Sequence, residues 1–455
     1  MISFAGRRVL VVGLGASGFA AAQALLELEA KVKVTEAGAS PLLSERAERL
    51  RALGAEVEIG GHDLERIGAD LAIVSPGIPP TSEVVRALMA SGVRVWSEIE
   101  LAFRLARCDL LAVTGTNGKT TTTSLLASML ERSGIPSLAA GNIGLPLIDA
   151  ISQVPQGGAI ALEVSSFQLA TIESFRPRVA VLLNIAEDHT DWHGSIDAYA
   201  AAKARIAENQ TSTDAFVFAA ADERCAQIAG TVPSRRIPFA PDHLPEGGAG
   251  VSDGMLVVAG EELIDAARLP LQGVAGLEDT LAAAAAALDY GIERTAVLRA
   301  IEGFEPLRHR LEVVARHDGV VYIDDSKATN PHATLAAVRG LKDVVLIAGG
   351  RSKGIDLTAL AATVPPVTAV IALGEAADEV AKVFDGLVDV EIVADMEAAV
   401  RQASARSIAG GSVLLSPGCA SLDMYDSYAA RGDDFARRVR TLVGETRREA
   451  SGGNA

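Results

Sequence analysis

A lysine and four threonines follow a glycine-rich turn in the first third of the chain. Residues 110–122 read Leu-Leu-Ala-Val-Thr-Gly-Thr-Asn-Gly-Lys-Thr-Thr-Thr. The apolar run predicts a buried strand, and a helical pattern extends from Thr120 to Arg132. Backbone N–H groups of a glycine turn and of a helix N-terminus point at anionic oxygens. This order of elements therefore suits a bound triphosphate.

Lys119 and Thr120 carry side chains that a triphosphate needs. A lysine here can reach the β- and γ-phosphates, and a threonine hydroxyl can hold Mg²⁺. Val113 stands where the Gly-x4-Gly-Lys pattern has a glycine, and an ordinary strand-to-helix turn is the alternative. We predict an ATP site with these nucleotide-binding residues: Gly115, Thr116, Asn117, Gly118, Lys119, Thr120 and Thr121.

Length, charge and cysteine content limit the class of protein. The 455 residues suggest about three domains at ~150 residues each. A net charge of −17 argues against a nucleic-acid or anionic-membrane surface, so we expect no such partner. Cys108, Cys225 and Cys419 are widely spaced and offer neither a disulfide framework nor a zinc pattern. They favour a reducing compartment, the cytoplasm.

A second glycine turn lies near the start of the chain. The turn is Gly13-Leu-Gly-Ala-Ser-Gly18, between a predicted strand over 8–12 and a predicted helix over 19–28. A second strand is predicted over 32–35, with Glu36 at its end. This order is the dinucleotide-type βαβ pattern. A tight turn without a ligand is one alternative. A secretory signal is another, but three glycines would weaken its hydrophobic helix. No other stretch is long and apolar enough to span a bilayer.

Polar residues also follow or interrupt the apolar runs of the middle region. Glu163 lies in a run that looks buried on both sides, and a carboxylate is seldom buried without a cation or metal. His189 comes just after the strand predicted over 179–184, so we interpret it as a functional group rather than a surface residue. Asn142 lies in a turn and could bind a ligand. Lys203, among alanines of a predicted helix, reads in isolation as a solvated lysine.

The last third of the chain predicts another doubly wound domain. A hairpin over 311–324 comes first, and polar loops follow strands that end near residues 324, 348 and 415. Loops after parallel strands converge at one sheet edge. They would bring Arg310, Lys327 and Lys353 to a region that can receive carboxylates and phosphates. Scattered, solvated cations are the alternative.

Five segments of the middle region, in this order, resemble the Mur ligase family: Thr-Gly-Thr-Asn-Gly-Lys-Thr, Gly-Asn-Ile-Gly, Glu-Val-Ser-Ser-Phe-Gln-Leu, Asn-Ile-Ala-Glu-Asp-His and Ala-Ala-Lys-Ala-Arg-Ile. Within the family the chain is most similar to members that add D-glutamate to UDP-N-acetylmuramoyl-L-alanine. The family's loop, Thr-Gly-Thr/Ser-Asn-Gly-Lys, also accounts for Val113. The resemblance implies an ATP-dependent amide ligase of peptidoglycan precursor synthesis that works through an acyl phosphate.

The resemblance also implies the roles of metal and catalytic residues. Thr120 and Glu163 would help to hold one Mg²⁺, and His189 a second. Lys203 would be carbamylated, which turns a cation into a carboxylate-like metal ligand. Lys119, His189 and Lys203 would be the catalytic residues.

Nucleotide and substrate contacts in the outer domains are implied in the same way. Arg310 would contact the ATP phosphates and Asp325 the ribose. Substrate contacts would come from Ala16, Ser17, Glu36 and Ser75 for the UDP moiety, from Asn142, and from Lys327, Thr329, Lys353, Ser421 and Tyr428 for D-glutamate.

Two segments depart from the family pattern. The helix that usually begins Gly-x-His-Asn-x-x-Asn has Glu278, Asp279 and Ala282 here, which leaves the adenine contacts open. The family often has a basic residue soon after the second strand, whereas this chain has Ala37 and Gly38 there. The resemblance therefore implies the uridine contacts less directly than the others.

We therefore predict an α/β protein, a monomer of three domains. A Rossmann-like domain that binds the UDP substrate would span 1–108, a central P-loop ATPase-type domain 109–307, and a Rossmann-like, amino-acid-binding domain 308–455. Another Mur-type ligase or a folylpolyglutamate ligase is one alternative. A nicotinamide-dependent dehydrogenase that uses Gly13 to Gly18 is an alternative from another class.

Overall fold

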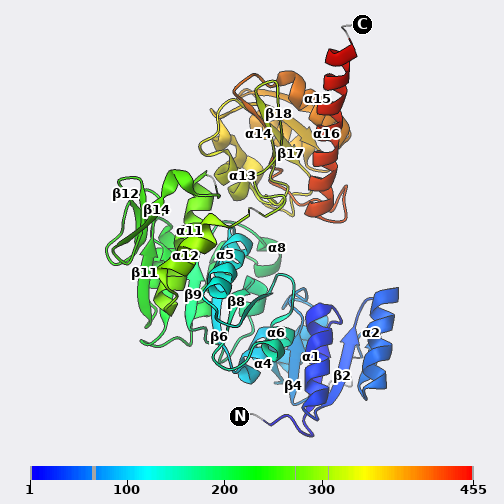
Figure 1. Ribbon diagram of the computed structural model, residues 1–455. Coiled ribbons are helices and arrows are strands. Elements are labelled where there is room, and N and C mark those ends of the chain that lie inside the picture. The colour runs from blue at the N-terminus through cyan, green and yellow to red at the C-terminus, as the bar shows by residue number, and fades with distance from the viewer. Residues whose placement is uncertain (1–2, 64–67, 272, 306, 453–455) are drawn as a thin grey trace. The chain divides into compact units, whose positions relative to one another are not determined.

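The computed structural model describes residues 3–63, 68–271, 273–305 and 307–452. The chain divides into two compact units, residues 1–185, 192–269 and 278–304 in the first, and residues 186–191, 270–277 and 305–455 in the second. Three separate sheets carry the fold (Figure 1). The predicted α/β class with three domains is confirmed. Among the described helices, none combines the length and apolar character needed to cross a membrane.

The first sheet is fully parallel, with the order β3-β2-β1-β4-β5. Its strands are β1 (Arg8–Val12), β2 (Lys31–Glu36), β3 (Glu56–Ile59), β4 (Leu71–Val74) and β5 (Arg94–Ser97). Its helices are α1 (Ala16–Glu27), α2 (Pro41–Ala52), α3 (Glu83–Ala90) and α4 (Glu98–Leu105). The first helix begins at Ala16 rather than at the predicted Phe19, because the turn ends in an extended N-cap at Gly15. Helix α1 therefore presents its N-terminus directly after β1.

The second sheet has nine strands in the order β14-β13-β12-β11-β10-β9-β6-β8-β7. Its parallel part begins with six strands: β6 (Asp109–Thr114), β7 (Ser137–Gly141), β8 (Ala159–Glu163), β9 (Val179–Leu182), β10 (Ala215–Ala219) and β11 (Arg235–Phe239). The strand after them, β12, also pairs with β11 in parallel. An antiparallel meander closes one edge: β12 (Ala249–Ser252), β13 (Met255–Val258) and β14 (Glu261–Asp265). The parallel strands are apolar runs because helices cover both faces of such a sheet.

The helices around the second sheet follow the strands in βα order. They are α5 (Lys119–Arg132), α6 (Leu147–Gln153), α7 (Ser166–Leu169), α8 (Thr190–His193), α9 (Ile196–Ala204), α10 (Glu223–Ala229), α11 (Gly273–Tyr290) and α12 (Arg294–Glu302), with 3₁₀ turns η2 (Arg205–Ala207) and η3 (Ala266–Arg268). Helix α5 packs on β7 and β8 and against α12 (Figure 1). The predicted helix over 120–132 is confirmed with one extra residue.

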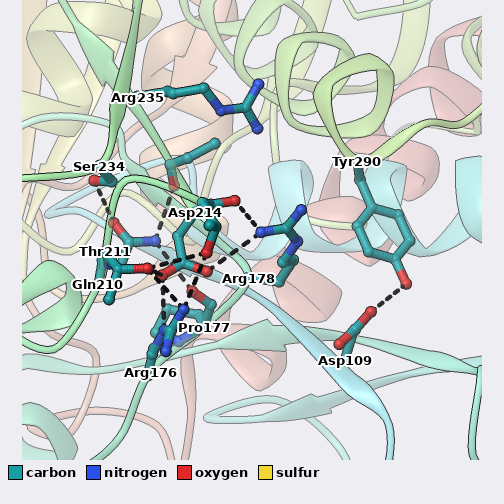
Figure 2. A network of polar contacts seen from close by, with 12 residues as sticks. Asp109, Arg176, Pro177, Arg178, Gln210, Thr211, Asp214, Ser234, Arg235 and Tyr290 are labelled. Atoms are coloured by element: carbon teal, nitrogen blue, oxygen red, sulfur yellow. Dashed lines mark hydrogen bonds and ion pairs between the residues drawn. The ribbon is translucent and has the colours of Figure 1, made fainter.

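A dense polar network ties together the amino ends of β9, β10 and β11 (Figure 2). Asp214 accepts hydrogen bonds from Arg176 Nε at 2.7 Å and from the Thr211 backbone N–H at 2.7 Å. Gln210 Nε2 donates to the carbonyls of Pro177 and Ala215, at 3.1 and 2.9 Å. Burial would raise the pKa of Asp214, but the hydrogen bonds from Arg176 and Thr211 outweigh it and hold that pKa below its ordinary value. This edge of the sheet is therefore a satisfied polar network.

The third sheet lies in the second unit, with the order β15-β16-β20-β17-β18-β19. Its strands are β15 (Glu312–His317), β16 (Val320–Asp324), β17 (Val344–Gly349), β18 (Val367–Leu373), β19 (Asp389–Ile392) and β20 (Ser412–Leu415). Only the edge strand β15 is antiparallel, as the predicted hairpin requires. The helices are α13 (Pro331–Val338), α14 (Ala377–Phe384), α15 (Met396–Arg406) and α16 (Tyr428–Gly452), with the 3₁₀ turn η4 (Leu357–Thr363). Helix α16 lies along α15 (Figure 1).

Candidate active site

The loop between β6 and α5 is held in shape by glycine and by an asparagine. Gly118 has a φ of +82°, and a Cβ added there would lie 2.2 Å from Asp279 Oδ1, so only glycine fits. The Asn117 N–H donates to Asn184 Oδ1 at 2.8 Å, and the Thr116 N–H donates to the Asn184 carbonyl at 3.0 Å. Asn184 follows β9, so two neighbouring strands fix the loop. The N-terminus of α5 opens directly from it, as an anion site requires.

Two lysines donate to carbonyls of this loop. Lys119 Nζ lies 2.9 Å from the Gly115 carbonyl oxygen and 2.8 Å from that of Thr116. Lys203 Nζ lies 2.7 Å from the same Gly115 oxygen and sits over the Tyr199 ring, 4.5 Å from its centroid. Lys203 is only 1% exposed. Lys203, which reads in isolation as a solvated lysine, is thus buried in the structure, because α9 turns this side chain inward onto the phosphate loop.

Glu163 ends β8 and is buried, with 2% exposure. Asn142 Nδ2 donates to its Oε1 at 2.9 Å, which brings together two residues singled out in the sequence. Its Oε2 is buried and makes no hydrogen bond to any described residue. A buried carboxylate oxygen without a hydrogen bond is costly unless a cation is bound. Glu163 therefore fits the Mg²⁺ that the resemblance implies, and the Thr120 hydroxyl at the start of α5 is a suitable oxygen donor.

Two residues beside the loop were missed or left open by the sequence reasoning. Asp279 Oδ1 accepts a hydrogen bond from Thr122 Oγ1 at 3.1 Å, although the residues are 157 positions apart. The Tyr199 hydroxyl donates to Thr116 Oγ1 at 3.3 Å. The only sequence signal for Asp279 was an acidic residue near the start of an alanine-rich helix, and the structure shows that this residue is buried.

The predicted UDP contacts line one cavity in the first unit. Its volume is about 620 Å³, and Ala16, Ser17, Glu36 and Ser75 all lie on its wall. Both carboxylate oxygens of Glu36 accept backbone N–H groups, from Leu14 and Gly38, each at 2.7 Å. Glu36 thus joins the glycine turn after β1 to the chain after β2.

A buried arginine holds the polar loops of the second unit together. Arg431 donates to the carbonyls of Ser326 at 2.9 Å, Cys419 at 3.1 Å and Gly349 at 3.5 Å. These three carbonyls follow β16, β20 and β17, so the predicted convergence of the loops is confirmed. Burial lowers the pKa of Arg431 to about 10, which still leaves the side chain charged near neutral pH.

The predicted amino-acid contacts lie on these loops. Lys327 Nζ is 3.7 Å from the centroid of the Tyr428 ring, a cation–π contact. Lys353 Nζ is 3.8 Å from Asp188 Oδ1, and Asn330 Nδ2 donates to Asp188 Oδ2 at 3.2 Å. Ser421 is buried and Thr329 is half-buried. Asp188 therefore gives the second unit an acidic group among its cations.

The predicted nucleotide contacts of the second unit also lie close together. Burial raises the pKa of Asp325 to about 7, against the opposing effects of a hydrogen bond from Ser416 Oγ at 2.8 Å and of the charge of Arg310. His189 lies on the 186–191 segment, which groups with this unit. It has a φ of +53°, and its Nε2 is 3.8 Å from Asp188 Oδ2.

Family models match most of the chain. The MurD-like N-terminal domain of Mur ligases matches residues 7–97, the Mur ligase middle domain residues 113–287, and the Mur ligase glutamate ligase domain residues 309–419. A UDP-N-acetylmuramoylalanine–D-glutamate ligase of Frankia casuarinae is 44% identical, over 97% of this chain and 96% of the relative. The chain belongs to the Mur ligase family.

Further relatives agree with this assignment. A Geobacillus kaustophilus protein of the same description is 41% identical over 96% of this chain and 98% of its own length. Among solved structures, MurF from Acinetobacter baumannii is 18% identical with a TM-score of 0.62, and 94% of this chain and 93% of that chain are covered. MurC from Thermotoga maritima is 19% identical with a TM-score of 0.57, over 96% of this chain and all of that chain. These structures support the Mur ligase fold.

The structure thus distributes the predicted residues of this Mur ligase among three places. The phosphate loop, Glu163, Asn142 and Lys203 share the carboxyl edge of the second sheet. The predicted UDP contacts share the cavity of the first sheet. The predicted amino-acid contacts and His189 lie in the second unit. One group of residues in the second unit was not predicted. It consists of His309, Glu312 and Asp324, whose potential metal-ligand atoms all lie within 4.8 Å of one another.

Proposed function

We propose that this Mur ligase joins D-glutamate to the alanyl carboxyl group of UDP-N-acetylmuramoyl-L-alanine in peptidoglycan precursor synthesis, with cleavage of ATP. A carboxylate is a poor acyl donor to an amine, so a carboxylate oxygen first takes the γ-phosphoryl group of ATP, which gives an acyl phosphate and ADP. The amine of D-glutamate then attacks the acyl carbon, phosphate leaves, and the amine loses a proton. The observation that carries the proposal is the phosphate loop with Lys119, in a chain similar to D-glutamate ligases over nearly its whole length.

The first unit would perform the activation step. The N–H groups of the loop and of α5 bind the phosphates, and Lys119 turns from the Gly115 and Thr116 carbonyls toward the β- and γ-phosphates. Mg²⁺, when bound, would neutralise charge on the transferring phosphoryl group. We assign Thr120 and Glu163 to one Mg²⁺ and His189 to a second.

Lys203 would act as a carbamate. Carbamylation removes the positive charge of a buried ammonium group and provides two oxygens beside the phosphate loop. The carbamate is supported by the burial of Lys203, by the contact of this side chain with the Gly115 carbonyl, and by the family resemblance. A bicarbonate-free preparation is expected to lose activity and to regain it on addition of bicarbonate, with a mass increase that vanishes in Lys203→Ala.

The second unit would bind the amino acid. Lys327, Thr329, Lys353 and Ser421 would hold the two carboxylates of D-glutamate, with Tyr428 packed beside them. Arg310 and Asp325 would contact the nucleotide. The cationic side chains fit a dicarboxylate better than a neutral amino acid, which favours glutamate.

Phosphate release across a small substrate panel tests the function. We expect release only when ATP, UDP-N-acetylmuramoyl-L-alanine and D-glutamate are all present, and none with L-glutamate, L-alanine or a folate acceptor. Release with another pair would identify a different Mur-type or folylpolyglutamate ligase. A change in NAD(P)H absorbance without ADP formation would indicate a dehydrogenase.

We further propose a cytoplasmic monomer with domains at 1–108, 109–307 and 308–455. The three family-model matches lie inside these limits. The cytoplasm supplies ATP and keeps Cys108, Cys225 and Cys419 reduced, as they are in the structure. Sedimentation of the purified chain tests the oligomeric state.

A further inference from the structure

The cavity of the first sheet is poor in positive charge. Among the described residues that line it there is no lysine or arginine, while Glu36 and Glu83 are acidic. His62 is the one histidine among the described residues that line the cavity. The proposed function places a UDP group here and gives His62 no role, so the question is what its imidazole does.

The chain after β3 is built to bring His62 over the end of β2. Gly60, with a φ of +86°, turns the chain, and the N–H groups of Gly60 and Gly61 donate to the Glu36 carbonyl at 2.9 and 3.2 Å. An isolated antiparallel bridge pairs Gly61 with Glu36. His62 is thereby held next to Thr35, at the carboxyl edge of the sheet.

Thr35 fixes the tautomer of the ring. Thr35 Oγ1 lies 3.2 Å from the Gly61 carbonyl oxygen and 2.8 Å from His62 Nδ1. A carbonyl can only accept, so both contacts are hydrogen bonds only if the single hydroxyl hydrogen points to Gly61 and Nδ1–H donates to the hydroxyl oxygen. In the neutral ring Nε2 is then an acceptor, and the described residues offer it no hydrogen-bond partner.

The position of His62 indicates which part of the ligand it meets. In a doubly wound sheet the phosphates lie at the N-terminus of the first helix, here α1, and the nucleoside lies toward the end of the second strand, here Glu36. A uracil base presents one ring N–H donor between two carbonyl acceptors. An acceptor nitrogen beside Glu36 complements that donor.

We propose that His62 Nε2 accepts a hydrogen bond from N3–H of the uracil base and so contributes to selection of a uridine nucleotide. The inference rests on the proposed function, because it takes the UDP group of the substrate as the ligand. It makes His62 a specificity residue remote from the reacting atoms. Its loss should weaken binding of the nucleotide and leave turnover at saturating substrate unchanged.

Calorimetric titration with UDP and with N3-methyl-UDP tests the proposal. We expect the wild-type protein to bind UDP ~10-fold more tightly than the methylated nucleotide, the usual effect of one hydrogen bond. In His62→Ala this preference should disappear, because UDP binding alone weakens. The matched control is His243→Ala, at an exposed histidine outside the cavity.

His62→Gln keeps an acceptor oxygen and should retain part of the preference, which separates recognition from loss of the loop's structure. An unchanged preference in His62→Ala would overturn the proposal. So would an equal loss of affinity for UDP and for pyrophosphate, since the ring would then act on the phosphates. Turnover of the wild-type protein with D-glutamate is measured separately, so failure of the proposed function is distinguished from failure of this contact.

Discussion

The amino and carboxyl edges of the second sheet differ in how completely their buried polar groups are hydrogen-bonded. At the amino edge, Asp214 has a side chain only 3% exposed and accepts from Arg176 and Thr211 (Figure 2). At the carboxyl edge, Glu163 is equally buried, but its Oε2 has no hydrogen-bond partner among the described residues. Both carboxylates adjoin ends of parallel strands, and only one of them is fully paired.

This difference separates stability from function. A carboxylate that accepts hydrogen bonds from a cation and a backbone N–H stabilises the folded state in the absence of any ligand. A buried oxygen without a hydrogen bond costs stability until a ligand arrives, so it can contribute differential binding energy. We infer that the carboxyl edge is maintained for chemistry and the amino edge for folding. Substitutions at the two edges should therefore have opposite patterns of effect.

The largest effect is expected from Lys119→Ala at the carboxyl edge. Loss of a cation aimed at the transferring phosphoryl group should lower kcat/KM by roughly 10³-fold. The free energy of unfolding should change by less than about 1 kcal/mol, because Lys119 is half-buried and water can replace it at the two loop carbonyls to which it donates. Phosphate release and urea unfolding measure the two quantities.

The control for this variant is Lys342→Ala, at an exposed position of the second unit. It should leave both quantities unchanged. Activity within tenfold of wild type in Lys119→Ala would remove the phosphate loop from the mechanism.

Glu163→Gln should reduce activity by ~100-fold, because an amide is a weak Mg²⁺ ligand. Its free energy of unfolding without ligands should equal or exceed that of the wild type by about 1 kcal/mol, since an ionised oxygen without a hydrogen bond becomes neutral. The Mg²⁺ concentration for half-maximal activity should rise. Glu223→Gln, at an exposed position, is the control. A marked loss of stability in Glu163→Gln would show that this carboxylate is structural, like Asp214.

The carboxyl edge was largely predictable because its signals are local. Glycine, lysine and threonine follow one strand in a fixed order, and Glu163 interrupts an apolar run. Parallel strands buried on both faces appear as continuous apolar segments, so β6, β8 and β9 were also found. Local pattern alone could not predict the burial of Lys203, because it depends on how α9 packs on the phosphate loop; only the family resemblance gave this residue a role.

The amino edge was not predicted at all. Arg176 and Asp214 are 38 positions apart, and each alone looks like a surface charge between elements. The same limit applies to Arg431, which contacts a residue 105 positions away, and to the pair of Thr122 and Asp279. Such contacts depend on register and packing, which no local pattern contains.

Asp214→Ala should reverse the pattern of Lys119→Ala. It leaves the Thr211 N–H and two arginines without their acceptor, so the free energy of unfolding should fall by about 2–3 kcal/mol. The kcat/KM of the folded enzyme at low temperature should stay within about twofold of wild type, because the network lies at the edge opposite to the phosphate loop. Asp378→Ala, at an exposed aspartate, is the control. Loss of activity without loss of stability would remove the distinction between the edges.

The smallest expected effect is the pH dependence of the stability that Asp214→Ala loses. The pKa of Asp214 is lower in the folded protein than its unfolded value of about 3.9, so the folded state binds fewer protons. Its contribution is present above pH ~4 and is lost as the pH falls through the folded pKa. The difference in unfolding free energy between wild type and Asp214→Ala should therefore shrink between pH 5 and pH 3, by at most about 1 kcal/mol, the bound that the unfolded pKa sets.

Groups whose pKa is raised in the folded state change the unfolding free energy with pH in the opposite direction. Their contributions cancel in the difference between wild type and Asp214→Ala. Burial raises the pKa of Glu98 and of Asp325 to about 7, so each binds more protons when folded, and its contribution is lost as the pH rises from about 4 through 7. Both groups are present in wild type and in Asp214→Ala, at sites where the substitution changes no contact. If the difference in unfolding free energy between wild type and Asp214→Ala stays constant from pH 5 to pH 3, Asp214 stabilises the sheet by packing and neutral hydrogen bonds. The charge of Asp214 would then contribute nothing to the stability of the amino edge.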